Sequence, residues 1–385
     1  MHSEFIKRTE EFQRRLSDDR VDLSLIYDQD NLYYLSAYWG YLGMQFGRPT
    51  MMVIPGSGDP TIITPGLEAE MARKLTWVTN VQEWMDGVDG EWVTCLHSVL
   101  DGKGKLRVGI EKYRLHPVIL ECLKTEFQEH DLVDIAPMLA DMRMVKTLEE
   151  IEIMRQAGQV SIAMCQGGLE AIAEGVPEYE IALAVIAAGT RKAAEFLTDQ
   201  GPERLFSPMI YNLQVLQSGG PDLTMVHRRP TLRRVKRGES VYMCFCEMNN
   251  FKGFKLGFDR QYWVGKVADE EAALYEITLK AQKAALERIR PGVPAEEVHA
   301  AAAEVYQEAG FGLCYRTGRA VGFSLIEKPE LKLGDKTPLR AGMTFSVDAA
   351  ISIPEKTATR VGDSVLVTET GFDYLTPFPK ELRVL

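Results

Sequence analysis

One histidine lies in a loop where its imidazole is available for proton transfer. His227 is in a Gly/Pro-rich stretch just before a predicted β-hairpin, with strands over Val241–Glu247 and Lys255–Val264. An imidazole titrates close to neutral pH, so this side chain can take up a proton and return it during a reaction. His227 is therefore a candidate general acid and base. The alternative is a loop histidine that only hydrogen-bonds to the backbone.

Two aspartates on predicted strands are candidates for binding a cationic group. Asp259 lies on the second strand of the hairpin and Asp348 on a strand nearer the C-terminus. A carboxylate accepts strong, charge-assisted hydrogen bonds from a guanidinium or ammonium group. The alternative is that each forms a structural ion pair with a neighbouring arginine, Arg260 or Arg360. Glu247, at the end of the first hairpin strand, is a further candidate acid.

Two cysteines of the six in the chain lie close together in sequence. Cys244 and Cys246 are separated by one residue on a predicted strand, so both side chains point to one face. Without a second group of cysteines or histidines, this spacing is weak evidence for a zinc site. We predict buried thiols in a reducing cytoplasm, and a nucleophilic thiolate is the alternative.

Length and charge narrow the class of protein. The chain has 385 residues, which favours two domains, and its net charge is -11 at pH 7. An acidic surface argues against general nucleic-acid binding, since phosphates bind to basic faces. No apolar run approaches the roughly 20 residues needed to span a bilayer. The charged N-terminal stretch is not a signal peptide. We expect a cytoplasmic protein that binds neither nucleic acid nor membranes.

Strands alternate with helices in the first part of the chain. Predicted helices cover residues 5–16, 30–40, 67–75 and 117–127, and predicted strands cover residues 21–28, 106–112 and 132–137, with two more strands in 49–65. This alternation favours an α/β domain with a mixed sheet.

A capping box marks the start of the second part. Thr147 and Glu150 have the spacing that begins a helix, and we place the domain boundary here, giving domains over 1–145 and 146–385. Further helices are predicted over residues 177–196, 269–289 and 295–309, and strands over 318–326, 342–353 and 363–371. We expect helices outside a curved antiparallel sheet, and therefore an α+β fold overall.

Several motifs at consistent spacing resemble the creatinase/aminopeptidase P/prolidase superfamily. They are MRMVKTLEEIEIMR, VPEYEIAL, RPGVP, LRAGMTFSVD and DSVLVTETGFDYLT, and the resemblance covers nearly the whole chain. It implies a smaller N-terminal α/β domain followed by a catalytic domain with the pita-bread fold.

The metallopeptidase branch of this superfamily binds two metal ions through two aspartates, one histidine and two glutamates. The matching positions here hold Cys244 or Cys246, Gly257, Arg319, Asp348 and Gly362. A single carboxylate beside glycines and an arginine cannot hold a divalent pair. We therefore expect no metal and no cofactor at this site.

The similarity to creatinase, a metal-free member, implies roles for individual residues. Arg48, in the frame Phe46–Pro49, matches an arginine that reaches the neighbouring subunit's site and binds the substrate carboxylate, which implies a homodimer. His227 matches the catalytic histidine, and Asp259 and Asp348 match two pocket glutamates. Lys332 lies near the position that holds a second carboxylate-binding arginine in creatinase.

Other pocket residues remain open between two interpretations. Arg319 either binds a substrate carboxylate or neutralises Asp348. Phe46 and Cys246 are candidates for contact with substrate, and the former ligand position belongs to either Cys244 or Cys246.

The resemblance implies a metal-independent, amidinohydrolase-type enzyme. We expect it to cleave a C–N bond in a small, carboxylate-bearing metabolite such as a creatine-like guanidino or N-methyl amino acid. Either water or a carboxylate is the nucleophile. The alternatives are an ectoine-type cyclic amidine hydrolase, in which Asp259 or Asp348 attacks the ring, an osmolyte lyase, and a non-catalytic pseudo-peptidase that binds a partner.

Overall fold

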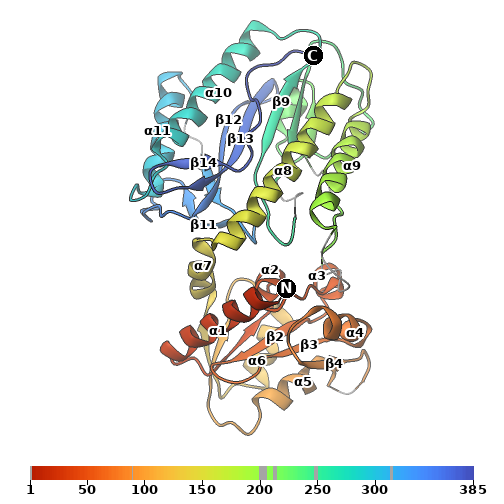
Figure 1. The fold of residues 1–385 in the computed structure, drawn as a ribbon, viewed down its shortest axis with the longest axis vertical. Coiled ribbons are helices and arrows are strands. Elements are labelled where there is room, and N and C mark those ends of the chain that lie inside the picture. Colours follow the sequence, from red (N-terminus) through yellow and green to blue (C-terminus); the bar gives the residue numbers. More distant parts are fainter. Residues whose placement is uncertain (1, 89, 199–205, 211–214, 247–249, 313–314) are drawn as a thin grey trace. The chain divides into compact units, whose positions relative to one another are not determined.

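The computed structural model describes residues 2–88, 90–198, 206–210, 215–246, 250–312 and 315–385 (Figure 1). The chain forms two compact units, Met1–Met142 and Arg143–Leu385. Among the described residues, no helix is long and apolar enough to cross a bilayer.

The first unit is built on a six-stranded mixed sheet with the strand order β4-β3-β2-β1-β5-β6. Its strands are β1 (Leu23–Ile26), β2 (Met51–Pro55), β3 (Thr61–Pro65), β4 (Asn80–Trp84), β5 (Arg107–Ile110) and β6 (Asp131–Asp134). Its helices are α1 (Ser3–Asp18), α2 (Gln29–Ser36), α3 (Tyr41–Phe46), α4 (Gly66–Leu75), α5 (Glu91–Leu100) and α6 (Pro117–Thr125), and α7 (Ala136–Met144) leads into the second unit. The mixed α/β architecture is confirmed, because β2 is antiparallel to both of its neighbours whereas β1, β5 and β6 run parallel.

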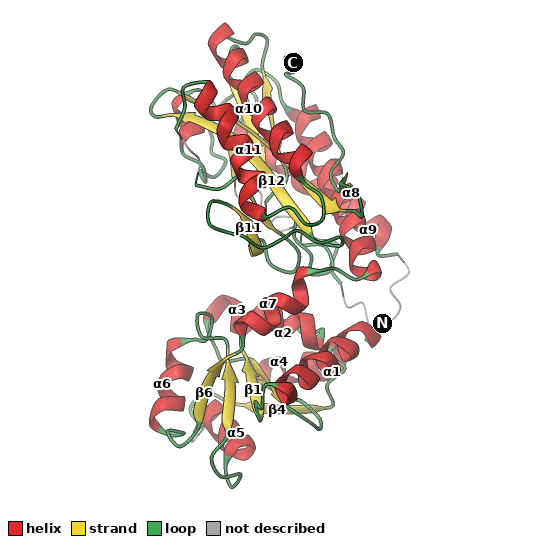
Figure 2. Cartoon of the chain, turned by 90° about the vertical axis from the view of Figure 1, so that its left-hand side faces the viewer, coloured by secondary structure: helices red, strands yellow, loops and turns green. Residues whose placement is uncertain are grey.

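The second unit contains an antiparallel sheet with the order β11-β10-β12-β13-β9-β8-β7, and β14 pairs with β13 (Figures 1 and 2). Its strands are β7 (Val215–Ser218), β8 (Ser240–Cys244), β9 (Asp259–Trp263), β10 (Gly318–Ala320), β11 (Glu327–Leu331), β12 (Thr344–Ile353), β13 (Thr357–Val367) and β14 (Phe372–Tyr374). Its helices are α8 (Leu148–Ala171), α9 (Glu178–Phe196), α10 (Asp269–Arg288) and α11 (Ala295–Glu308), with a short 3₁₀ turn over Pro221–Thr224. The predicted antiparallel sheet with helices is confirmed.

The helix that opens the second unit begins where the sequence indicates. Thr147 Oγ1 accepts a hydrogen bond from the backbone of Glu150, and the Glu150 carboxylate accepts one from the backbone of Thr147. This reciprocal cap satisfies two amides that would otherwise have no partner at the helix start.

The hairpin strands are shorter than predicted. β9 begins only at Asp259, because the residues before it bond elsewhere. The Lys255 backbone donates to the carbonyl of Gly322, and the Gly257 backbone donates to Ser364 Oγ. These partners lie outside the hairpin, so the preceding residues leave the strand ladder.

One face of the second sheet is apolar and covered by helices. Side chains of β12 and β13 pack into a core with α10 and α11, whose members include Val347, Ala349, Ile351, Val361, Val365, Leu274, Ala281, Ala285, Val298 and Ala302. Successive side chains on a strand point to opposite faces. The residues between these apolar positions therefore lie on the other face of the sheet.

Candidate functional site

The strand register gathers the chemically reactive residues on that other face. Cys244 pairs with Asp259, Asp259 with Gly362, and Gly362 with Asp348. Residues directly opposite each other in an antiparallel pair share a face. We call the face that carries these four residues and Arg360 the polar face.

Arg319 and Asp348 form an ion pair on the polar face. Arg319 is buried, and its guanidinium also donates to Cys246 Sγ at 3.4 Å and to a backbone carbonyl at 3.3 Å. Burial disfavours its charge, but Asp348 and Cys246 raise the pKa of Arg319 overall. Of the two interpretations left open by the sequence, the structure contains the one in which Arg319 neutralises Asp348.

Asp259 is a buried carboxyl group with an unusual titration. Burial, together with the charge of Asp348, raises the pKa of Asp259 to about 6. Cys246 Sγ donates to Asp259 Oδ1 at 3.7 Å. The ion pair considered between Asp259 and Arg260 does not form, because the Arg260 guanidinium bonds to Asp363 at 2.7 Å on the opposite face.

The glycines on this face leave no room for acidic side chains. A Cβ atom on Gly362 would lie 2.7 Å from Asp259 Oδ2 and 2.8 Å from Asp348 Oδ1. A Cβ atom on Gly257 would collide with the side chain of Ser346. With Arg319 beside them, these residues do not fit a pair of hard divalent cations, which need several carboxylate ligands.

Arg360 was considered from the sequence only as an ion-pair partner of an aspartate, and a role in binding a ligand was missed. It is 6% exposed and lies over the ring of Tyr242, 5.0 Å from the ring centroid. Neither terminal nitrogen of its guanidinium has a hydrogen-bond partner among the described residues. A buried charge normally has a partner, so this one is suited to an anionic ligand. Arg360 and Gly362 are two residues apart on one strand and therefore share a face, and this spacing is the sequence signal that could have revealed the role.

The loop of His227 is held beside the polar face. His227 itself is exposed in a turn. Gln217 Nε2 donates to the carbonyls on both sides of it, those of Val226 at 3.1 Å and Arg228 at 3.3 Å. Gln217 pairs with Tyr242 across β7 and β8, so this loop lies next to the strand that carries Cys244. The catalytic role of His227 stays a prediction.

A buried carboxylate fixes the same loop to helix α9. Glu178, at the first position of α9, accepts from Arg228 at 2.6 Å, Ser218 Oγ at 2.8 Å and Thr231 Oγ1 at 2.8 Å. Burial opposes the charge of Glu178, but these hydrogen bonds lower its pKa overall. The start of α9 therefore positions the loop that carries His227.

The remaining predicted site residues have local partners or lie outside the described residues. Lys332 donates to Glu330 at 2.9 Å. In the first unit, Arg48 pairs with Asp86, and Phe46 is 64% exposed. Glu247 lies outside the residues that the structure describes.

Solved prolidases share this fold along the whole chain. The prolidase from Thermococcus sibiricus superposes with a TM-score of 0.85 at 23% identity, covering 99% of both chains. The prolidase from Pyrococcus horikoshii superposes with a TM-score of 0.81 at 25% identity, covering 99% of this chain and 100% of that one.

Two curated relatives bear on the reaction. An Xaa-Pro dipeptidase from Pyrococcus furiosus is 27% identical over 379 residues, which cover 98% of this chain and 99% of the relative. The agropine synthesis cyclase of Rhizobium rhizogenes is 27% identical over 374 residues, which cover 93% of this chain and 92% of the relative.

These relatives correct the functional expectation drawn from the sequence. Relatives named for Xaa-Pro dipeptides contradict a metal-independent hydrolase of creatine-like guanidino or N-methyl amino acids. They also point to dipeptide hydrolysis rather than to the ectoine-type, lyase or binding-protein alternatives. The expectation was wrong because it inferred the substrate from a few pocket positions, whereas similarity along the whole chain points to peptidases.

Family models match both parts of the chain. The creatinase/prolidase N-terminal domain matches residues 8–145, and metallopeptidase family M24 matches residues 152–369. The second match covers more than half of the chain, which belongs to metallopeptidase family M24.

Proposed function

We propose that the protein is a hydrolase that cleaves the amide bond of a small, dipeptide-sized substrate carrying a free carboxylate. The bond type is supported by full-length similarity to Xaa-Pro dipeptidases. The observation that carries the proposal is the buried guanidinium of Arg360, whose terminal nitrogens have no partner among the described residues. A substrate carboxylate supplies the anion that this site lacks.

The polar face offers groups for the proton transfers of hydrolysis. Asp259 and Asp348 lie close together over Gly362, where a Cβ atom would be 2.7 Å from Asp259 Oδ2 and 2.8 Å from Asp348 Oδ1. Water adds to the amide carbonyl carbon, the C–N bond breaks, and one proton passes from the water to the leaving nitrogen. The candidates to carry that proton are Asp259, whose pKa is raised to about 6 by burial and the charge of Asp348, and His227 in the adjacent loop. Arg319 holds Asp348 in place through their ion pair.

In a homodimer, the exposed aromatic residues of the first unit would lie at the subunit interface. Phe46 is largely exposed and packs edge-on against Tyr41, itself 49% exposed. Exposed aromatic groups of this kind favour a protein interface. In this proposal Arg48 and Phe46 of each subunit approach the substrate site of the other, and Arg48 exchanges its Asp86 partner for substrate.

Intramolecular acyl transfer is the second candidate function. It is favoured by the similarity to the agropine synthesis cyclase along more than nine-tenths of both chains. A cyclase that closes its ring at an acyl carbon would differ from an amide hydrolase in that an internal group, and not water, is the nucleophile.

A mass-resolved substrate panel tests both candidates. The purified protein is incubated with Xaa-Pro dipeptides, other dipeptides and linear acyl amino acids, with added zinc or manganese and with a chelator. We expect cleavage of a dipeptide into two amino acids whose summed mass exceeds that of the dipeptide by one water molecule. Products that lose water or an amine in a single molecule support the cyclase instead. No conversion of any dipeptide contradicts the hydrolase proposal.

A further inference from the structure

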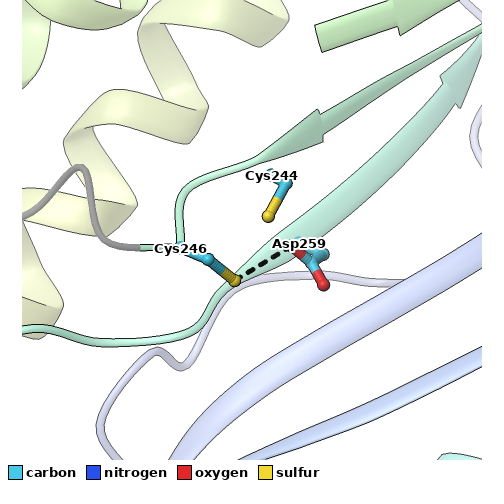
Figure 3. Close-up of side chains that lie close together, drawn as sticks. All are labelled: Cys244, Cys246 and Asp259. Atoms are coloured by element: carbon cyan, nitrogen blue, oxygen red, sulfur yellow. Dashed lines mark hydrogen bonds between the residues drawn. The ribbon is translucent and has the colours of Figure 1, made fainter. Parts of the chain in front are cut away.

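The end of β8 and the start of β9 bring two thiols and a carboxylate together. The Sγ atoms of Cys244 and Cys246 and a carboxylate oxygen of Asp259 all lie within 4.8 Å of one another. Figure 3 shows the three side chains directed toward a common point between the two strands. The arrangement follows from the register, because Cys244 pairs directly with Asp259 and Cys246 follows two residues later.

We propose that Cys244, Cys246 and Asp259 bind a single thiophilic divalent cation, for which zinc is the best match. Two thiolates and one carboxylate supply three ligands of a tetrahedral site, and zinc sites with three protein ligands keep the fourth position for water or substrate. Thiolate ligands select zinc over magnesium and manganese. This ligand set differs from the two hard ions that the polar face does not fit.

The charges around the three ligands are compatible with an ion. Two thiolates and one carboxylate carry three negative charges, which a divalent cation largely balances. Arg319 does not oppose the ion, since Asp348 neutralises it. Its guanidinium donates to Cys246 Sγ at 3.4 Å, and such hydrogen bonds from outside the ligand sphere orient a metal ligand and tune the metal.

The fourth ligand of such a site would be water or substrate, as in zinc sites with three protein ligands. Asp348 lies close to Asp259, since a Cβ atom on Gly362 would be within 2.8 Å of a carboxylate oxygen of each. An ion held here supplies a Lewis acid at the polar face. Asp259 then serves as a ligand, and proton transfer falls to His227 and Asp348.

Cobalt substitution of the full-length protein tests the site without any substrate. Cobalt(II) bound by thiolates has an intense near-ultraviolet charge-transfer absorption, which carboxylate or imidazole ligands alone do not produce. We expect saturation at one cobalt per chain, with zinc displacing it. Cys244→Ser and Cys246→Ser should each weaken the charge-transfer band and lower the affinity at least about tenfold, since even residues outside the ligand sphere change it by that factor.

Matched variants keep the test decisive. Cys122→Ser removes a buried thiol of the first unit and should leave the band and the affinity unchanged. Should a cysteine variant not fold, Asp259→Asn keeps both thiols and should retain the band while binding cobalt more weakly. Absence of the band in the wild-type protein, or a band unchanged by Cys246→Ser, overturns the proposal. Neither result decides whether the protein hydrolyses dipeptides, which the substrate panel tests separately.

Discussion

At the scale of single residues, two buried guanidinium groups of the polar face differ in their hydrogen-bond partners among the described residues. Arg319 is paired with Asp348, whereas the terminal nitrogens of Arg360 have no partner among the described residues. Both arginines are buried, so solvent does not explain the difference. Arg360 is therefore the better anchor for a substrate carboxylate.

Replacing Arg360 should weaken substrate binding more than it slows turnover. Arg360→Met removes a buried, charge-assisted hydrogen bond, which contributes about 1.5–3 kcal/mol. We expect KM for a free dipeptide to rise roughly 10- to 100-fold with kcat little changed. A dipeptide with an amidated C-terminus should be affected far less. Arg155→Met, which replaces an arginine paired with Asp373, is the control. Equal losses for both substrates would contradict the anchor role.

A second residue-scale prediction concerns pH. Glu111 is buried and accepts from the backbones of Tyr27 and Asp28 and from Asn31 Nδ2. Burial and the charge of Asp28 raise the pKa of Glu111 to about 7. The folded state therefore holds this proton more tightly than the unfolded state, and stability falls as pH rises from about 4 to 7.

Glu111→Gln should remove that pH dependence. Each pKa unit corresponds to about 1.36 kcal/mol. As the pH rises across this range, the free energy of unfolding of the wild type should therefore fall by about 3 kcal/mol relative to that of the variant. Urea titrations at several pH values measure the difference. Glu121→Gln, an exposed change on α6, is the control. A pH-independent difference between Glu111→Gln and wild type would contradict the assignment.

At the scale of elements, the start of α9 and the loop of His227 form one unit. Glu178 accepts hydrogen bonds from Arg228, Ser218 and Thr231 and is completely buried. Removing one member of a buried ion pair leaves the other uncompensated, which costs roughly 3–5 kcal/mol. The loop therefore depends on this single carboxylate.

Glu178→Gln should lower the free energy of unfolding by roughly 3 kcal/mol and expose the loop to proteolysis. The pKa of Glu178 is lowered in the folded state, so its contribution is present near neutral pH and is lost as the pH falls. Glu180→Gln, an exposed change in the same helical turn, should have little effect. Equal stability of the two variants would show that the loop does not rely on Glu178.

Local signals predicted many of the elements, but they do not show how the strands pair. The capping box at Thr147 and the helices around it follow from residues close in sequence. β4 was missed because it is an edge strand with few buried side chains and no apolar alternation. The shared face of Cys244, Asp259 and Asp348 depends on register among strands far apart in sequence. No spacing along the chain reveals that register.

At the scale of the whole molecule, each of the two units has its own core, and the polar face belongs to the second. The first unit contributes to the proposed chemistry only through Arg48 and Phe46 of a neighbouring subunit. A test of the dimer must therefore separate a residue's effect in its own subunit from its effect in the other.

Dimers that combine two different variants distinguish these two effects. Arg48→Ala and Asp259→Asn homodimers should both be inactive. In a heterodimer of the two, one site combines an intact Asp259 with an intact Arg48 from the partner chain. An equal mixture after subunit exchange should recover about one quarter of wild-type activity, as two-fold symmetry requires. No recovery in a mixture shown to exchange subunits would place both residues in the same subunit's site.

In the proposed reaction the polar face adds water to a dipeptide amide bond, and mass spectrometry in water labelled with heavy oxygen tests this step most directly. We predict that wild-type protein releases a carboxylate carrying one heavy oxygen atom. The rate should fall sharply in Asp259→Asn and, at low substrate concentration, in Arg360→Met. Unlabelled products, or an unchanged rate of labelled-product formation in the Asp259→Asn variant, would contradict this reaction.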